Sequence, residues 1–199
     1  MDMMDKSGFL AYIFRLRYIN RWGLMKNTEN ENVAQHSFDT AVIAHALALI
    51  ARDICSKNID PEKIACAALY HDVSEVITGD MPSPIKYVSP DIVNMYRELE
   101  NNAKETLLSD IPSALEKSYR SFLFLTDEEE RYVKAADKLS AYFKCVSELK
   151  SSNSEFKNAK ENILASVKSM GMEEVDIFLS MFEEAVNFDL DALASGNVK

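Results

Sequence analysis

One long apolar segment, residues 32–54, limits the folds open to this chain more than any other feature of its sequence. It reads NVAQHSFDTAVIAHALALIARDI, and its apolar residues would cover most sides of a helix rather than one stripe. Such a helix has to be surrounded by other elements, so the segment predicts a buried, central helix. The chain also has only 5 glycines and 5 prolines, too few for the many tight turns of an all-β fold. The expected fold class is all-α.

Local start and stop signals predict further helices on both sides of this segment. Asp60-Pro61 is typical of a helix start, with an aspartate cap and proline at the first helical position, and that helix should run to about Thr78-Gly79. A first helix should run from Ser7 towards Arg17, and another from Ser89-Pro90 to about Leu107, with Leu99 on its apolar face. A capping box of Thr126 and Glu129 predicts a helix that ends at about Leu149. The other expected helices cover about 112–124 and two amphipathic stretches near 156–167 and 175–186.

The segment GDMPSPIKYVSP (79–90) contains three prolines and a glycine, so we expect an irregular loop there. No repeat, linker or low-complexity stretch divides the chain. With 199 residues it is long enough for one medium-sized domain with a substantial core. We therefore expect a single helical domain over residues 1–199.

The charge balance restricts the partners of this domain. There are 22 basic and 32 acidic residues, which gives a net charge of −10. A surface of this kind repels phosphate polymers, because nucleic-acid binding depends on rows of Lys and Arg that replace counterions. We expect no nucleic-acid polymer as a partner, whereas a small anionic substrate needs only local positive charge.

The cysteines and the N-terminal segment favour a cytoplasmic protein. Cys55, Cys66 and Cys145 are scattered in apolar helical contexts without any CxxC pair, so we expect buried, reduced thiols. The start of the chain, MDMMDKSGFLAYIFRLR, lacks the basic beginning and the cleavage site of a signal peptide. No uninterrupted apolar run of about 20 residues offers a membrane span.

The three histidines differ in what they can do together. His36 and His45 lie nine positions apart on the predicted central helix, so at about 100° per residue they point to opposite sides. They cannot both serve one site. We expect His45 to be a core histidine bonded to a backbone carbonyl.

His36 has other potential partners on two further apolar helices. His71 and Asp72 stand together in YHDVSEVITGD (70–80), and Asp137 lies in VKAADKLSAYFKC. Ionisable groups turned into a core need pairing or a cation, and one divalent metal would satisfy all four. Imidazoles and carboxylates suit Mn, Co, Fe, Ni or Zn without selecting among them. As alternatives, a His-Asp dipeptide also occurs by chance, and Asp137 can pair with Lys134 or Lys138 or face solvent.

The pattern of His36, His71-Asp72 and Asp137 resembles the H…HD…D signature of the HD-domain phosphohydrolases. Three longer stretches resemble the YfbR-type 5′-deoxynucleotidases in order and spacing, and the resemblance covers most of the chain. They are INRWGLMKNTENENVAQHS (19–37), YHDVSEVITGDMPSPIKY (70–87) and KAADKLSAYFKC (134–145).

The resemblance implies an all-helical homodimer that hydrolyses deoxyribonucleoside 5′-monophosphates to the nucleoside and phosphate, with one divalent metal such as Co or Mn. The implied metal ligands are His36, His71, Asp72 and Asp137. The implied catalytic residues are Glu75, Arg21 and Asp72. The implied substrate contacts are Arg21, Trp22, Asp72, Asp80, Met81, Pro82, Ser83 and Asp137, with Arg21 on the phosphate and the loop from Asp80 on the deoxyribose.

Elementary chemistry supports these roles and also supplies alternatives. Glu75 comes four residues after His71, hence on nearly the same face of a continuous helix, where it could relay a proton. Arg21 offers a planar fork matched to phosphate. Without the resemblance, however, Glu75 reads as a solvated carboxylate, Arg21 as a surface charge and Trp22 as a core anchor. Without the resemblance, Asp80 would be a loop residue that hydrogen-bonds its own backbone. Lys86 is a weaker candidate for phosphate contact, and its alternative interpretation is a surface charge on the loop.

Two positions depart from the family pattern. Gln35 stands before His36 where glutamate is expected in many relatives, so we expect an altered metal preference or rate if that side chain orients the ligand. The loop reads DMPS at 80–83 in place of a bulkier or β-branched variant, which affects fine substrate preference. Two other functions stay open, an HD hydrolase of another phosphoester (a cyclic nucleotide or a nucleoside triphosphate) and a non-catalytic nucleotide-sensing module.

Overall fold

The computed structural model describes residues 6–196. The two ends of the expected 1–199 domain, including the acidic start of the N-terminal segment, lie outside these residues. Regular secondary structure between residues 6 and 196 is helical, with one isolated β-bridge between Asn20 and Asn32. The predicted all-α fold class is confirmed.

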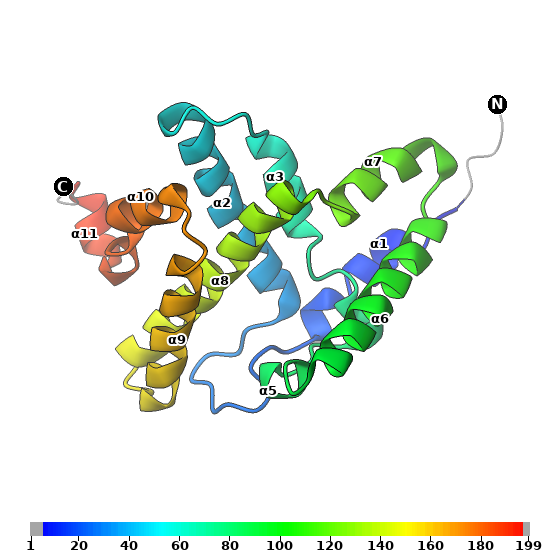
Figure 1. Ribbon diagram of the computed structural model, residues 1–199. Helices are drawn as coiled ribbons and strands as arrows, with labels where there is room; N and C mark the ends of the chain where they lie inside the picture. Colours follow the sequence, from blue (N-terminus) through cyan, green and yellow to red (C-terminus); the bar gives the residue numbers. More distant parts are fainter. Residues whose placement is uncertain (1–5, 197–199) are drawn as a thin grey trace.

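The predicted central helix is α2 (Val33–Leu49), which one π-helical turn, η2 (Ile50–Ile54), extends. It lies between α3 (Pro61–Leu69) and α8 (Asp127–Lys150), its two main neighbours (Figure 1). Its start is fixed by a reciprocal cap: the Asn32 side chain accepts from the Gln35 backbone N–H, and the Gln35 side chain accepts from the Asn32 N–H, both at 3.0 Å. Gln35 is therefore an exposed helix-capping residue.

The segment Val33–Ile54 has 22 residues and a mean hydropathy of 1.2, enough to cross a membrane by length and composition alone. Half of it is buried inside the protein, and Leu47 and Ala48 have no exposed surface. Packing against α3 and α8 accounts for the apolar residues on its buried side, whereas Phe38 and Val42 are 63% and 56% exposed.

The helix that begins at Asp60-Pro61 ends earlier than the sequence predicts. The Asp60 side chain caps it as expected, accepting from the Lys63 N–H at 2.9 Å, but α3 stops at Leu69. A tight turn follows, with N–H groups bonded three residues back, among them Glu75 N to Asp72 O at 3.0 Å. A separate short helix, α4 (Glu75–Thr78), then ends at Gly79, whose φ of +72° suits glycine. The prediction of one continuous helix through 70–78 was wrong, and with it the shared helix face of His71 and Glu75.

The loop at 79–90 contains a short helix, α5 (Ser83–Lys86), so it is less irregular than predicted. Helices α6 (Pro90–Ser109) and α7 (Ser113–Leu123) follow at the predicted places, and Ser89 caps α6 through the Ile92 N–H at 3.3 Å. Most predicted apolar positions of α6 pack inward, but Leu99 is 49% exposed. The first helix is also shorter than expected: α1 (Phe9–Ile13) is followed by a separate 3₁₀ turn, η1 (Leu16–Tyr18).

Two apolar clusters support the chain on either side of the turn at 70–74. The larger lies among α2, α3, α8 and α10, and the smaller contains residues of α1, α6 and α7 together with Val73 of the turn. The Thr126–Glu129 capping box that opens α8 is present as predicted. After α8 come η3 (Ser154–Phe156), α9 (Lys157–Lys168), α10 (Glu173–Phe182), η4 (Ala185–Asn187) and an unexpected α11 (Leu190–Ala194).

The cysteines are free but not all buried. Cys145 lies in the core, whereas Cys55 and Cys66 are partly exposed, so the prediction of three buried thiols holds for Cys145 alone.

Candidate functional site

Three elements bring the predicted metal ligands together at the middle of the molecule. His36 comes from α2, His71 and Asp72 from the turn after α3, and Asp137 from α8. Ligand atoms of His36, His71 and Asp137 all lie within 4.8 Å of one another. The Asp72 Oδ2 atom is 3.0 Å from His71 Nε2 and 3.6 Å from His36 Nε2, so Asp72 belongs to the same cluster.

Hydrogen bonds on the outer ring nitrogens orient both imidazoles towards this cluster. His71 Nδ1 lies 2.7 Å from the Ala68 carbonyl, which requires a proton on Nδ1 and leaves the Nε2 lone pair directed inward. His36 Nδ1 lies 3.1 Å from Ser140 Oγ, and its Nε2 lies 3.0 Å from Asp137 Oδ1. Such outer bonds are what fix the tautomer of metal-binding histidines.

The donor set fits a divalent cation. His71 Nε2 is buried, faces the Asp72 carboxylate at 3.0 Å and forms no well-oriented hydrogen bond within residues 6–196. Bonds of about 2.1 Å to one metal ion place adjacent donor atoms about 3.0 to 3.4 Å apart, and the closest separations here run from 3.0 to 3.6 Å. Two neutral imidazoles and two carboxylates satisfy Mn, Co, Fe, Ni or Zn alike.

Both carboxylates of the cluster are held in their ionised form. Although burial acts the other way, His71, His36 and Arg21 hold the pKa of Asp72 well below its usual range. For Asp137 burial is again the opposing effect, and the His36 contact lowers the pKa. Neither Lys134, which binds Glu130 at 2.8 Å, nor Lys138 pairs with Asp137 within residues 6–196, and the Asp137 side chain is 41% exposed.

Arg21 lies directly beside the predicted ligands and is not a surface arginine. Its side chain is 14% exposed, its Nη1 donates to Asp72 Oδ2 at 3.2 Å, and its Nη2 is 4.0 Å from Asp137 Oδ1. It therefore brings positive charge to the place where an anionic substrate would need it.

Glu31 is a site residue that the sequence reasoning missed. Its Oε1 lies 3.1 Å from Arg21 Nε and 3.4 Å from His36 Nδ1, and its Oε2 accepts a hydrogen bond from Trp22 Nε1 at 3.1 Å. Glu31 precedes α2, so no helical spacing connects it to His36. Ser140 was missed as well, but its position three residues after Asp137 on α8 was a usable signal.

Trp22 is held in an unusual backbone conformation. Its φ is +59°, which a non-glycine residue adopts only when its surroundings impose it, and such strain gathers at functional sites. The indole packs against Phe156 with ring centres 5.3 Å apart. The Trp22 side chain is thus held by its ring contact with Phe156 and by the hydrogen bond from its indole N–H to Glu31.

Glu75 and Asp80 form the acidic side of the site. Glu75 is 7% exposed, and burial, reinforced by Asp72 and Asp80, raises its pKa to about 10. Its Oε2 has no hydrogen-bond partner in the described part of the chain. Burial likewise raises the pKa of Asp80, while Arg21 opposes the shift. Met81 and Pro82 of the loop are half-buried, and Ser83 is exposed at the start of α5.

Two other candidates are placed away from the cluster. Lys86 Nζ binds Glu100 at 2.9 Å and covers the Tyr96 ring at 4.5 Å, so it is not a free loop charge. His45 contributes no atom to the cluster and is half-buried. The hydrogen bond to a backbone carbonyl that we expected for His45 is absent from residues 6–196.

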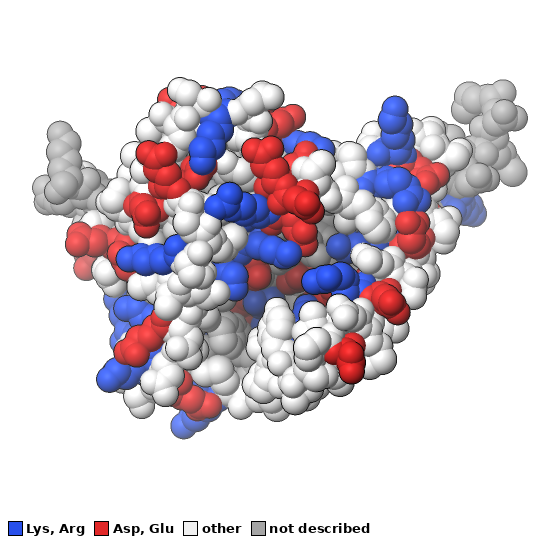
Figure 2. Space-filling view, viewed as in Figure 1, with Lys and Arg blue, Asp and Glu red and all other residues white. Residues whose placement is uncertain are grey.

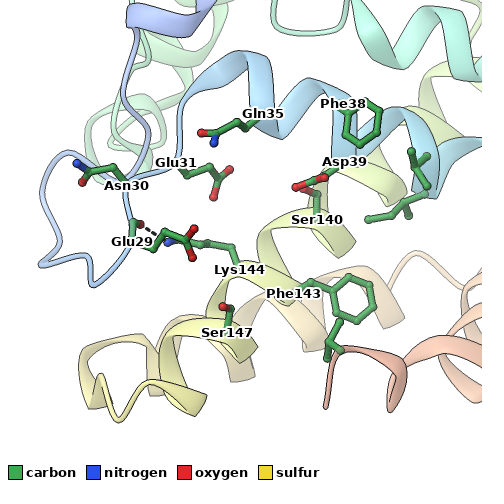
Figure 3. A pocket seen from close by; sticks show the side chains of 13 residues that line it. Glu29, Asn30, Glu31, Gln35, Phe38, Asp39, Ser140, Phe143, Lys144 and Ser147 are labelled. Atoms are coloured by element: carbon green, nitrogen blue, oxygen red, sulfur yellow. Dashed lines mark hydrogen bonds between the residues drawn. The ribbon is translucent and has the colours of Figure 1, made fainter. Parts of the chain in front are cut away.

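A cavity of about 420 Å³ lies between α2, α8 and the loop that precedes α2 (Figure 3). Glu31 and Ser140, which both contact His36 Nδ1, line it, together with Asp39 and the rings of Phe38 and Phe143. None of the predicted site residues lines this cavity. Its rim carries Glu29, Glu31 and Asp39 beside Lys144, and this acidic balance disfavours a phosphate.

The fold and the cluster of two histidines and two aspartates define the class as HD-domain phosphohydrolases. An HD-domain phosphohydrolase from Listeria innocua superposes with a TM-score of 0.76 at 23% identity, over 89% of this chain and 87% of that one. A cyanophage S-2L HD phosphohydrolase, bound to dA and one catalytic Zn²⁺, superposes with a TM-score of 0.66 at 19% identity, over 89% and 95% of the two chains.

Sequence comparison places the chain within this class. The model of the YfbR-like 5′-deoxynucleotidase family matches residues 8–186. A 5′-deoxynucleotidase from Photorhabdus temperata is 43% identical over 191 residues, covering 94% of this chain and 97% of that protein. Another from Pectobacterium atrosepticum is 40% identical over 194 residues, covering 96% and 98%. The chain belongs to the YfbR-like 5′-deoxynucleotidase family.

Proposed function

We propose that this protein is a metal-dependent 5′-deoxynucleotidase, which hydrolyses deoxyribonucleoside 5′-monophosphates to the deoxyribonucleoside and inorganic phosphate. The observation that carries the proposal is the convergence of both histidine Nε2 atoms and two carboxylates, in a chain 40–43% identical to 5′-deoxynucleotidases over nearly its whole length. The single helical domain is taken to extend over residues 1–199.

The residues proposed to hold the metal are His36, His71, Asp72 and Asp137, and the ion is Co, Mn or a similar transition metal. Such a cation supplies an acidified water and offsets negative charge on phosphate oxygens. The outer hydrogen bonds of the histidines, to Ala68 and to Ser140, hold the ring nitrogens in the required orientation.

Arg21 and Trp22 are proposed to bind the substrate from the loop that precedes α2. The guanidinium lies beside Asp72 and Asp137. Its N–H groups that do not bond Asp72 can donate to phosphate oxygens at the ligand cluster. Asp72 and Asp137 would then border the phosphate. Figure 2 shows Lys and Arg side chains, mixed with Asp and Glu side chains, around a hollow near the middle of this face.

Glu75 is proposed to relay a proton to the leaving 5′ oxygen. It is buried, its Oε2 has no partner within residues 6–196, and burial beside Asp72 and Asp80 raises its pKa, which favours the protonated form. Asp80 is proposed to accept a hydrogen bond from the deoxyribose 3′-hydroxyl. Met81, Pro82 and Ser83 would complete the sugar-binding loop and crowd a ribose 2′-hydroxyl.

The proposed setting is a cytoplasmic homodimer that acts on small molecules, with neither a nucleic-acid polymer nor a membrane as partner. The net charge of −10 supports the exclusion of phosphate polymers. Burial of much of the one long apolar helix among α3 and α8 supports the exclusion of a membrane.

A phosphate-release assay tests the proposal. The protein is supplied with Co²⁺, Mn²⁺ or Zn²⁺ and a panel of deoxy- and ribonucleoside 5′-monophosphates, cyclic nucleotides and triphosphates. We expect phosphate release from the deoxymonophosphates above all. Turnover of cyclic nucleotides or triphosphates alone would identify another phosphoesterase of the same class, and binding without turnover would favour a sensing module.

A further inference from the structure

The loop between η1 and α2 carries much of the candidate site and closes on itself. Its ends meet at the Asn20–Asn32 bridge, where Arg21 N–H bonds Glu31 O at 3.0 Å. Arg21, Trp22 and Glu31, the residues that contact one another at the ligand cluster, all lie at these ends. Contacts that hold the middle of the loop should therefore affect the positions of Arg21, Trp22 and Glu31.

The middle of the loop rests on one buried carboxylate, Glu148, near the end of α8. Glu148 is 1% exposed, and its Oε2 accepts from Thr28 N–H at 2.9 Å and from Thr28 Oγ1 at 2.6 Å. Its Oε1 accepts from Glu29 N–H at 3.3 Å and from Lys144. Asn153 completes the set with a bond to Oε2 at 2.9 Å. Hydrogen bonds to a charged, buried group are among the stronger ones in proteins.

The segment that follows α8 adds further contacts to the same loop. Asn153 also donates to Lys26 O at 2.6 Å, and Glu155 accepts from Lys26 N–H at 3.3 Å. Phe156, next along the chain, packs against Trp22. Ser152 has a φ of +65°, an uncommon conformation that turns the chain back at the end of α8. The end of α8 and η3 together form a seat for the loop.

The metal ligands do not share this dependence. His36 stands on α2, His71 and Asp72 on the turn after α3, and Asp137 about three helical turns before Glu148 on α8. Release of the loop would thus displace Arg21 and Trp22 while leaving the four ligands in place.

We propose that Glu148 is a positioning residue, which holds the 21–31 loop so that Arg21, Trp22 and Glu31 meet the ligand cluster. Its effect on catalysis rests on the proposed nucleotidase function, through Arg21 and Trp22 as substrate-binding residues. Its effect on the loop does not.

The substitution Glu148→Gln tests both parts in the full-length protein. Trp22 is the only tryptophan in the chain, so its fluorescence reports the loop directly. We expect a red-shifted emission and stronger acrylamide quenching than in the wild type. We also expect KM for a deoxynucleoside monophosphate to rise about tenfold or more, roughly the loss of one charged hydrogen bond, while kcat and the affinity for Mn²⁺ change less than about threefold.

Glu174→Gln is the matched control. Glu174 has no exposed surface and binds Lys57 at 2.6 Å and Tyr132 at 2.7 Å, so it too is a buried carboxylate paired with a lysine, but far from the loop in sequence and contacts. It should lower Tm without moving the Trp22 emission or KM. Wild-type emission and KM in Glu148→Gln would overturn the proposal, as would equal changes in Glu174→Gln.

A milder variant covers the case in which Glu148→Gln does not fold. Thr28→Val removes only the 2.6 Å hydroxyl bond and should change emission and KM in the same direction by a smaller amount. An unchanged Thr28→Val would then overturn the proposal. If the wild type hydrolyses no deoxymonophosphate, the proposed function fails, while the fluorescence comparison still decides whether Glu148 holds the loop.

Discussion

Replacing Glu31 by glutamine should weaken the contacts that join Arg21 and Trp22 to His36, while the bond from Arg21 to Asp72 remains. Glu31 is the only side chain in the described site that contacts Arg21, Trp22 and His36 at once, at 3.1, 3.1 and 3.4 Å. Glutamine has nearly the same size but no charge and a single acceptor oxygen. It can keep the bond from the Trp22 indole or the contact with Arg21, but not both.

The expected size of the effect follows from the burial of these contacts. The side chains of Glu31 and Arg21 are 12% and 14% exposed, so solvent screens their attraction only weakly. A hydrogen bond or ion pair to a charged group at such a site contributes about 1.5 to 3 kcal/mol. Loss of one of them should lower kcat/KM for a deoxynucleoside monophosphate by about 10- to 150-fold.

Steady-state phosphate release measures this change, with Glu29→Gln as the matched control. Glu29 lies in the same loop but is exposed, so its variant should stay within about twofold of the wild type. The double variant of Glu31→Gln with Arg21→Lys should lose less than the sum of the two single losses, because both remove the same ion pair. A Glu31→Gln enzyme as active as the wild type, or fully additive losses, would refute the reasoning.

The remaining predictions concern the metal ligands, the proton relay, and the residues His45 and Lys86. Mn²⁺ at about 100 times its Kd should stabilise the wild type by ~2.7 kcal/mol, a Tm rise of about 5 to 10 °C for a chain of this size. Scanning calorimetry should show that rise in His45→Gln and not in Asp137→Asn, and an equal response of the two variants would contradict the ligand assignment. Glu75→Gln should retain nucleotide binding by calorimetry yet lose at least about 100-fold in kcat, whereas near-normal turnover would exclude it as the proton relay. Lys86→Met should change KM by less than about threefold, because its ammonium is already paired with Glu100 at 2.9 Å. A tenfold rise in KM would instead indicate that Lys86 contacts the phosphate.

Much of the fold could be predicted from local signals in the sequence. Caps act within three residues, so Asp60, Ser89 and Thr126 marked the starts of α3, α6 and α8 correctly. The largely apolar character of residues 33–49 likewise identified the central helix, although one face, with Phe38 and Val42, stays exposed.

What the sequence could not predict depends on contacts between distant segments. The chain from Tyr70 to Ser74 has the composition of a helix, but in the fold it tightens into a turn that aims His71 and Asp72 at α2 and α8. Local helix propensity does not indicate such a turn, because the turn depends on contacts with α2 and α8. The same holds for Glu31, whose partners Arg21 and His36 approach it only through the Asn20–Asn32 bridge and the start of α2.

Gln35 has a structural role that the sequence did not reveal. Its place beside His36 suggested an effect on the metal, yet its side chain bonds the Asn32 N–H at 3.0 Å and closes the helix cap. Glutamate performs the same capping role. The change from glutamate to glutamine should thus alter the helix start rather than the ligand cluster.

The metal position tests the account most directly. An anomalous difference map from crystals grown with MnCl₂ should show one peak per chain, about 2.0 to 2.3 Å from the Nε2 atoms of His36 and His71 and from carboxylate oxygens of Asp72 and Asp137. A fully loaded crystal with its peak elsewhere, or with any of these four side chains turned away from the ion, would contradict it.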